Sequence, residues 1–307
     1  MRVMAPVLRA TIVGACLLTS TAALAAHLES GRLIKLKDVT LYCEVMGAKT
    51  GTPLFVVNGG PGFNHMYMHC SDAWEGLAKN RPLVFYDQRG NGKSSAIKPG
   101  MSCTLSDQIA DLDGLRAALG YDKIDLLGHS WGGYLVMAYA SRHQEHLSHL
   151  IIVDSAAPKW SDTVFLFKDI FPEATERQAA VAFASELGDS DAVAADLHEY
   201  MGLLFYAKEN RDRFFAMNLP YKYTRAVNAA LNTDLARYDL NPELPKFKMP
   251  TLVVTGRYDI NVAPSVAWKI HNAIPNSEFA VFEKSGHIPY FEERDAFVAR
   301  LEQFLGR

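Results

Sequence analysis

Short apolar runs alternate with helical patterns through most of this sequence, and the alternation restricts the fold more than any other feature. Most of the runs are soon followed by Gly, Asp or Asn, which commonly end buried strands. The six runs predicted as strands are 54–57, 83–86, 124–127, 150–153, 252–254 and 279–282. Strands separated by helices form parallel sheets with crossover helices. We therefore expect an α/β fold with a mostly parallel central sheet and flanking helices.

Three further segments complete the predicted main domain. Residues 28–46 have the pattern of antiparallel strands that flank such a sheet. An amphipathic helix should be capped by Ser106 and end at Gly120, and a second helix should end the chain. Their apolar faces consist of Ile109, Leu112, Leu115 and Leu119 in the first helix and of Phe297, Leu301 and Phe304 in the second.

One long segment interrupts the alternation. Residues 156–246 contain helical patterns punctuated by proline and no clear strand-like run. We interpret them as a helical cap inserted into one α/β domain made of residues 26–155 and 247–307. The cap holds 14 acidic and 10 basic residues, whereas the chain without its first 25 residues has 34 and 29. Most of the excess negative charge therefore lies in the cap, whose aromatic residues either line a pocket or pack the cap onto the domain.

The first 25 residues are predicted to be a signal peptide. Arg2 and Arg9 precede the apolar run 10–18, and an A-x-A sequence favours cleavage before Ala26. No later stretch is apolar and long enough to cross a membrane. We therefore expect a periplasmic or secreted protein with no membrane association after cleavage. The small net charge of -3 gives no indication of a nucleic-acid partner.

Cysteine usage leaves two alternatives open. After removal of the signal peptide the chain retains Cys43, Cys70 and Cys103. Either Cys70 and Cys103 form a disulfide, as an oxidising compartment would permit, or all three are buried thiols. Neither C-x-x-C nor H-E-x-x-H occurs, so the sequence indicates no metal or organic cofactor.

The sequence Gly128-His129-Ser130-Trp131-Gly132 lies between a predicted strand and a predicted helix. This is the G-x-S-x-G pattern in the strand-turn-helix context of a nucleophile elbow, where glycines allow the strand and helix backbones to approach each other. Ser130 is therefore the candidate nucleophile.

A serine nucleophile needs a base and an orienting carboxylate. Asp259 and His287 follow the strands 252–254 and 279–282, at the strand ends where sites on parallel sheets gather. The order Ser130, Asp259, His287 is the order expected for a nucleophile elbow. Asp154 is an alternative carboxylate because it ends the strand 150–153. The alternatives for the base are His65 and His69, which follow a glycine-rich loop.

An oxyanion hole requires backbone N–H groups directed at the developing charge. One should come from Trp131, the residue after the nucleophile. The other should come from the loop 58–62 (Asn-Gly-Gly-Pro-Gly), and the N–H of Gly60 is the favoured donor.

These motifs resemble those of α/β-hydrolases of the proline iminopeptidase type, which are serine aminopeptidases with a helical cap. The matching segments are 59–62, 87–94 (Asp-Gln-Arg-Gly-Asn-Gly-Lys-Ser), 130–133, 256–259 and 286–287. The resemblance implies the α/β-hydrolase fold, the triad Ser130, Asp259 and His287, and oxyanion donors from Gly60 and Trp131. The chain departs from the family at Asn58, usually His, at His129, usually Gly, and in lacking the cap's W-x-x-W-E signature.

The predicted function is hydrolysis of a small amide or ester through an acyl-enzyme on Ser130. The substrate is a small molecule or a short peptide, and the resemblance favours release of an N-terminal residue. The alternative within this class is an esterase, lactonase or aryl-amidase acting on small hydrophobic compounds. A non-catalytic binding protein is the alternative from another class, disfavoured because all three triad positions hold competent side chains. The sequence leaves the oligomeric state open.

Overall fold

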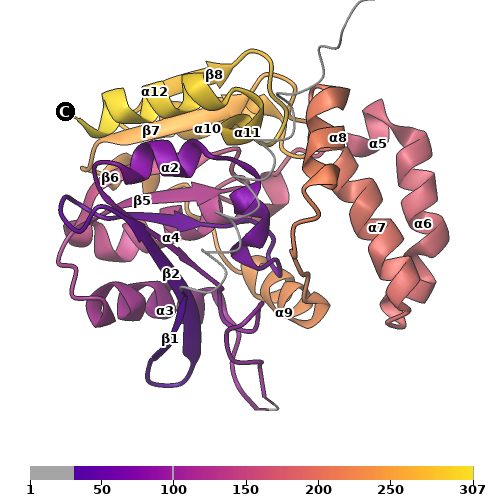
Figure 1. Ribbon diagram of the computed structural model, residues 1–307, viewed down its shortest axis with the longest axis horizontal. Helices are drawn as coiled ribbons and strands as arrows, with labels where there is room; N and C mark the ends of the chain where they lie inside the picture. The colour runs from indigo at the N-terminus through magenta and orange to yellow at the C-terminus, as the bar shows by residue number, and fades with distance from the viewer. Residues whose placement is uncertain (1–30, 99, 307) are drawn as a thin grey trace, which may run out of the picture.

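The computed structural model describes residues 31–98 and 100–306, and the predicted signal peptide with its cleavage point lies outside them. Eight strands form one sheet in the order β1-β2-β4-β3-β5-β6-β7-β8 (Figure 1). The strands are β1 (Arg32–Lys35), β2 (Thr40–Gly47), β3 (Leu54–Val57), β4 (Pro82–Tyr86), β5 (Ile124–His129), β6 (Leu147–Val153), β7 (Thr251–Gly256) and β8 (Glu278–Phe282). β2 pairs antiparallel with β1 and β4, and every other pair is parallel. The predicted fold class and all six predicted strands are confirmed.

Helices cover both faces of the sheet (Figure 1). The short helix η1 (His65–Cys70), α2 (Ala73–Ala78), α11 (Pro289–Glu292) and α12 (Arg294–Leu305) contribute to one hydrophobic core. The core on the other face contains residues of α3 (Leu105–Ala118), α4 (Trp131–His143) and α10 (Pro264–Ala273). The sheet is thus buried on both sides, which explains why its central strands read as continuous apolar runs.

The amphipathic helix α3 begins two residues before the predicted start. Its N-cap is Thr104, whose hydroxyl accepts from the N–H of Asp107 while the Asp107 carboxylate accepts from the N–H of Thr104. The predicted cap, Ser106, lies inside the helix, because the reciprocal pair satisfies two backbone donors and Ser106 would satisfy one. The predicted end at Gly120 is confirmed by its positive φ of 80° just after the helix.

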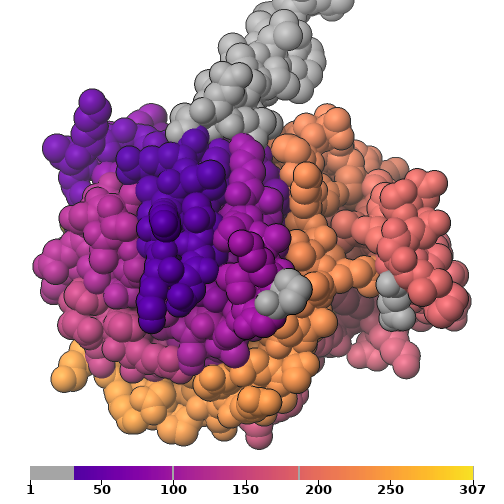
Figure 2. All heavy atoms as spheres, turned by 90° about the horizontal axis from the view of Figure 1, so that it is seen from below, coloured from indigo at the N-terminus to yellow at the C-terminus, as the bar shows by residue number. Residues whose placement is uncertain are grey.

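Five α-helices and the short 3-10 helices η3 (Trp160–Asp162) and η4 (Leu244–Lys246) lie between β6 and β7, where the cap is predicted. The α-helices are α5 (Phe167–Ile170), α6 (Pro172–Glu186), α7 (Ser190–Gly202), α8 (Lys208–Ala216) and α9 (Arg225–Leu235). α5 to α8 project from one end of the sheet (Figure 1) and form a lobe in the space-filling view (Figure 2). By contrast, α9 buries Val227, Leu231 and Leu235 in the core beside α3. The exact cap boundaries stay a prediction.

The proposed pairing of Cys70 with Cys103 is wrong. Cys70 lies in the core under α2 and α12, whereas Cys103 lies in the core of the opposite face. Both are buried free thiols, as is Cys43. The sheet separates the two residues because η1 and α3 pack on different faces, which the sequence order alone does not reveal.

Within the described part of the chain, no helix combines the length and apolarity that a membrane crossing requires.

Candidate active site

Ser130 occupies a strained turn between β5 and α4. Its φ is 59° and its ψ is -123°, a backbone conformation that costs a residue with a side chain about 1–3 kcal/mol. The turn is possible because glycine flanks it. A Cβ on Gly128 would lie 2.2 Å from the carbonyl oxygen of Gly132, and one on Gly132 would lie 2.3 Å from that of Val57. The elbow therefore presents Ser130 at the carboxyl end of the sheet.

Asp259 and His287 meet at the same end of the sheet. His287 Nδ1 donates to Asp259 Oδ2 at 2.7 Å, and both residues are buried. Asp259 Oδ1 accepts from the N–H groups of Asn261 and Val262 at 2.8 and 2.9 Å. The two backbone bonds to Oδ1 thus hold the carboxylate in place. The bond from Oδ2 to His287 fixes the imidazole tautomer in which Nδ1 carries the proton. In that tautomer, Nε2 carries the lone pair that a general base requires.

Ser130 and His287 line one small pocket, but the hydrogen bond expected between them is not formed. Among the described residues, the group bonded to His287 Nε2 is the side-chain amide of Asn261, which donates at 2.8 Å. Ser130 is 8% exposed and faces the same pocket. The amide of Asn261 must therefore leave Nε2 before Ser130 can pass its proton to His287.

Asp154, the alternative carboxylate, has another environment. It has a φ of 46°, and its Oδ1 accepts from the N–H of Gly256 at 2.9 Å. Complete burial, with the adjacent Asp259 as second cause, raises the pKa of Asp154 well above its ordinary value. Burial thus favours the protonated form of Asp154, whereas the carboxyl hydrogen-bonded to His287 is that of Asp259.

The loop after β3 lies against the nucleophile. β3 and β5 pair with Val57 opposite Gly128, and a Cβ on Gly59 would lie 2.9 Å from the Cβ of Ser130. Gly60 follows with a φ of 137°, which favours glycine. Trp131 is the first residue of α4, so its N–H has no acceptor within the helix. Of the two predicted oxyanion donors, Gly60 lines the pocket of Ser130 and Trp131 follows Ser130 directly, and the role of both stays a prediction.

Gln88 connects the two segments that carry these donors, and the sequence analysis assigned it no role. Its Oε1 accepts from the indole Nε1 of Trp131 at 2.8 Å, and its Nε2 donates to the carbonyl of Asn58 at 2.8 Å. The side chain of Asn58 in turn donates to the carbonyls of Gly59 and Phe63, both at 2.9 Å. Asn58 therefore fixes the shape of the loop. The Asp-Gln-Arg-Gly motif that begins at Asp87 was the sequence feature from which a role for Gln88 could have been predicted.

His129 is a second residue whose role was missed. Its Nε2 lies 2.8 Å from the backbone carbonyl of His287, and its Nδ1 lies 2.8 Å from the hydroxyl of Tyr67. That hydroxyl accepts from the N–H of Gly59 at 2.5 Å. Burial lowers the pKa of His129 well below its ordinary value, so the ring is neutral, donating from Nε2 and accepting at Nδ1. His129 thus joins the loop that carries His287 to the loop 58–62, which carries Gly59 and Gly60.

The pocket at Ser130 is narrow and its wall is mostly apolar. The cap residues Tyr200, Met201 and Leu204 close the pocket on one side. The remaining lining residues are Gly59, Gly60, Phe63, Tyr67, His129, Ser130 and His287. None of these lining residues, all within the described chain, carries a carboxylate.

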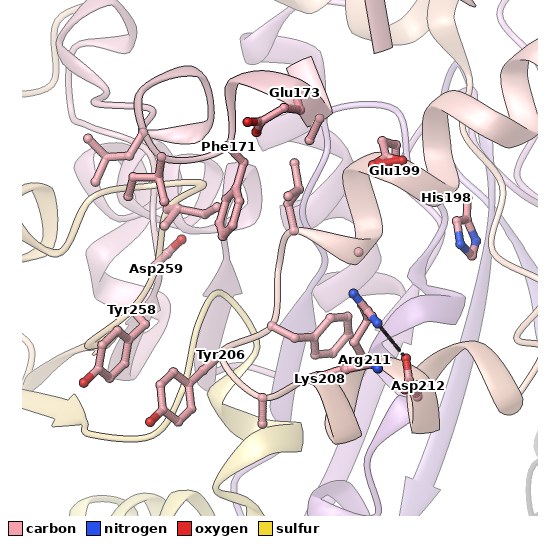
Figure 3. Close-up of a pocket in the computed structure, with 18 of the residues that line it drawn as sticks. Phe171, Glu173, His198, Glu199, Tyr206, Lys208, Arg211, Asp212, Tyr258 and Asp259 are labelled. Atoms are coloured by element: carbon pink, nitrogen blue, oxygen red, sulfur yellow. Dashed lines mark hydrogen bonds and ion pairs between the residues drawn. The ribbon is translucent and has the colours of Figure 1, made fainter. Parts of the chain in front are cut away.

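A larger cavity of about 990 Å³ lies between the cap helices and the loop of Asp259 (Figure 3). Tyr206 and Tyr258 flank one end together with Asp259, and Glu199, Arg211 and Asp212 lie toward the other. The charged lining residues are Glu173, Arg177, Glu199, Lys208, Arg211, Asp212, Arg257 and Asp259. Other cap aromatics pack instead: Tyr221 and Tyr223 contact the ring of Phe63.

The cap is attached to the loop of the base. The N–H of His287 donates to the carbonyl of Leu204 at 2.8 Å. The carboxylate of Glu292 accepts from the N–H groups of Tyr206 and Ala207, both at 3.0 Å, and from that of Gly286 at 2.7 Å. Burial raises the pKa of Glu292. We call these contacts, made by Leu204, Tyr206, Ala207, Gly286, His287 and Glu292, the cap junction.

The alternative bases His65 and His69 do not line the pocket of Ser130. Both rings face Glu44 of β2, and His65 Nδ1 also donates to Asp87 at 2.7 Å. The structure therefore brings Ser130 and His287 to one pocket and places these two histidines elsewhere.

Comparison with known proteins places the chain in a family. The family model described as the alpha/beta hydrolase fold matches residues 52–294. A proline iminopeptidase of Saccharolobus solfataricus is 30% identical, with 87% of this chain and 89% of that protein covered. A proline iminopeptidase of Levilactobacillus brevis is also 30% identical, over 83% of this chain and 88% of the relative.

Solved structures share the fold. A thermophilic esterase from Thermogutta terrifontis superimposes with a TM-score of 0.68 at 26% identity, covering 89% of this chain and 98% of the esterase. An alpha/beta fold family hydrolase from Bacillus anthracis reaches 0.73 at 24% identity, with 90% and 98% covered.

Proposed function

Because this chain belongs to the alpha/beta hydrolase fold family and is a hydrolase, we propose that it acts through an acyl-enzyme formed on Ser130. The observation that carries the proposal is the bond between His287 Nδ1 and Asp259 at 2.7 Å, beside a serine on a strained elbow. A serine hydroxyl near neutral pH attacks only when a base accepts its proton, and this arrangement supplies an oriented base.

The reaction proceeds in two halves. The substrate carbonyl enters the pocket, the amide of Asn261 leaves His287 Nε2, and Ser130 attacks as its proton passes to Nε2. The N–H groups of Gly60 and Trp131 stabilise the oxyanion. His287 then protonates the leaving amine or alcohol, and a water molecule activated by His287 hydrolyses the ester on Ser130. Asp259 remains ionised and stabilises the imidazolium.

We propose that the acyl group is an N-terminal residue, with proline as the first candidate. The relatives that match this chain over nearly all of their length are named proline iminopeptidase. The rings of Phe63, Tyr67 and Tyr200 suit a compact apolar side chain. The excess of acidic residues in the cap favours approach of a cationic amino terminus.

An esterase acting on small uncharged acyl groups is the second candidate, and one observation favours it. The lining of the Ser130 pocket contains no carboxylate, so an ammonium group bound there would have no counter-ion among these residues. A buried charge without a partner is costly, whereas an uncharged acyl group avoids this cost.

A substrate panel separates the two candidates. The purified protein is assayed on proline and alanine aryl-amides and on short-chain aryl esters, with Ser130→Ala as the control for background hydrolysis. The proposal predicts turnover of the proline amide at a rate well above the control. Ester turnover without aminoacyl-amide turnover would establish the second candidate, and activity retained by Ser130→Ala would reject both.

We also propose that the protein works in the periplasm or outside the cell, on the basis of the predicted signal peptide. Expression of the full chain followed by fractionation and N-terminal sequencing tests this. A mature protein that begins at Ala26 in the exported fraction is expected, and an uncleaved protein in the cytoplasm would contradict it.

A further inference from the structure

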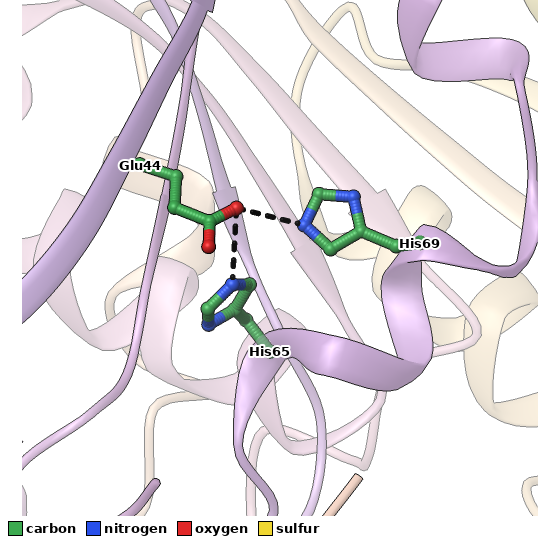
Figure 4. Close-up of side chains that lie close together, drawn as sticks. All are labelled: Glu44, His65 and His69. Carbon is green, nitrogen blue, oxygen red and sulfur yellow. Dashed lines mark ion pairs between the residues drawn. The ribbon is translucent and has the colours of Figure 1, made fainter. Parts of the chain in front are cut away.

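Three side chains outside the active site converge on one point. Glu44 comes from β2, and His65 and His69 come from η1, so the two elements face each other across a small gap (Figure 4). Glu44 and His65 are buried, and the side chain of His69 is 6% exposed. One ligand atom from each residue lies within 4.8 Å of the other two. The proposed hydrolysis uses none of them.

Both imidazoles approach the same carboxylate oxygen. Glu44 Oε2 lies 3.5 Å from His65 Nε2 and 3.2 Å from His69 Nε2 (Figure 4). In a tetrahedral zinc site with bonds of about 2.05 Å, any two ligand atoms lie about 3.3 Å apart. The two separations from Glu44 Oε2 are close to the edges of such a tetrahedron, and all three ligand atoms lie within 4.8 Å of one another. Glu44 is the ion-pair partner of the buried Nε2 of His65, at a distance and geometry outside those of a hydrogen bond.

The neighbouring groups orient these ligand atoms. His65 Nδ1 lies 2.7 Å from Asp87 Oδ1, and this contact turns Nε2 of the ring toward Glu44. The hydroxyl of Tyr42 donates to Glu44 Oε1 at 2.9 Å and leaves Oε2 facing the histidines. Metal-binding histidines typically donate their second N–H to a carboxylate, and ligating carboxylates are themselves hydrogen-bonded. Asp87 also accepts from the backbone N–H of Lys93 at 2.7 Å, so its own position is fixed.

We propose that Glu44, His65 and His69 bind a Zn²⁺ ion, with a water molecule as fourth ligand. Two imidazoles and one carboxylate are a donor set that zinc prefers, whereas Mg²⁺ and Ca²⁺ prefer oxygen ligands throughout. The sequence analysis missed this site because its third ligand lies on a distant strand and the histidines do not form the H-E-x-x-H motif.

The zinc site has a structural role. Tyr67 lies between the two histidines on η1, and its hydroxyl contacts the N–H of Gly59 and the ring of His129. A metal that ties η1 to β2 therefore restrains the segment that positions the oxyanion loop. None of the three ligands lines the Ser130 pocket, so the ion takes no part in the chemical step.

The test measures metal binding directly. The protein is purified without a polyhistidine tag, stripped with a chelator, and titrated with Zn²⁺ against a chromophoric competitor. We expect one tightly bound zinc per chain and a higher melting temperature with zinc. Glu44→Gln and His69→Gln should each weaken binding by about 100-fold or more, since each removes a ligand. His146→Gln is the matched control, because His146 is a half-buried histidine away from the cluster, with its Nε2 3.8 Å from Glu145.

Cobalt provides a second measurement that needs no variant. Co²⁺ bound at this site should give the intense visible absorption of a tetrahedral complex, and an equivalent of Zn²⁺ should remove it. The proposal is overturned if the stripped wild type binds no zinc, if His69→Gln binds it as tightly as the wild type does, or if cobalt gives only the weak spectrum of an octahedral ion. An ion pair alone would produce these negative results.

Discussion

Ser130 combines a side chain with a backbone conformation that suits glycine. Its φ of 59° places the Cβ where it contacts the following backbone. Catalysis needs the hydroxyl at this position, so the protein retains the strain. Complete removal of the Ser130 side chain should therefore relieve the strain and abolish the activity.

Ser130→Gly should be more stable than Ser130→Ala by about 1 kcal/mol, because alanine keeps the strained Cβ and glycine removes it, less the entropy that glycine loses on folding. Both variants should be inactive. Urea denaturation of the two proteins measures the difference. A glycine variant less stable than the alanine variant would show that the turn is not strained.

Substitution of Asp259 and of Asp154, the two candidate carboxylates, should lower the activity to different extents. Asp259→Asn should lower kcat by about 10³–10⁴-fold, because the amide favours the wrong imidazole tautomer. Asp154→Asn should cost less than about tenfold, since burial raises the pKa of Asp154 and favours its neutral form, of which an amide is a near-isostere. Steady-state kinetics of both variants checks the assignment. If Asp154→Asn loses more activity than Asp259→Asn, then Asp154 is the orienting carboxylate.

At the scale of elements, three loops at the carboxyl end of the sheet share one hydrogen-bond network. His129 is the last residue of β5, Gly59 follows β3, and His287 follows β8. The ring of His129 bonds to the carbonyl of His287 and, through the hydroxyl of Tyr67, to the N–H of Gly59. A charged imidazole would break this arrangement, because Nδ1 must accept from Tyr67. The network therefore depends on the neutral ring that burial maintains.

The free energy of unfolding should reveal this neutral histidine. Its folded pKa is depressed, so below the unfolded value of about 6.5 only the unfolded chain binds the proton. Stability is then lost as pH falls, by up to about 1.4 kcal/mol per pH unit. The stability advantage of wild type over His129→Gln should shrink between about pH 7 and pH 5. A difference that does not change with pH would mean that the folded pKa of His129 equals its unfolded value, and a difference that grows as pH falls would mean that the folded pKa is raised.

The sequence predicted elements well where a single local pattern decides them. The elbow is one example, because glycine spacing and strand-helix order fix it. The N-cap of α3 was misplaced because Ser106 and Thr104 are both competent caps, and only the reciprocal bonds with Asp107 decide between them. The roles of Gln88 and His129 and the cluster around Glu44 depend on contacts between distant segments, which no local pattern contains.

At the scale of the whole molecule, the sheet divides the interior into two cores, and the cysteines are distributed between them. A disulfide between Cys70 and Cys103 would have to pass through the sheet. The fold therefore depends on packing for its stability and needs no crosslink among the cysteines of residues 31–98 and 100–306.

Reduction should consequently leave the protein unchanged. We expect the same melting temperature with and without a reductant, and thiol titration should count Cys43, Cys70 and Cys103 only after denaturation, because all three are buried. Rapid labelling of any of them in the native protein, or a fall in melting temperature on reduction, would contradict this expectation.

The cap junction has a consequence for how caps are exchanged among related enzymes. Leu204 and Glu292 connect the cap backbone to the loop of His287, so a foreign cap spliced in at residues 156 and 246 would also replace the acceptor for the N–H of His287. A chimaera that retains residues 204–207 with their native backbone course should keep a competent base. Recombination that ignores this segment should give folded but inactive proteins.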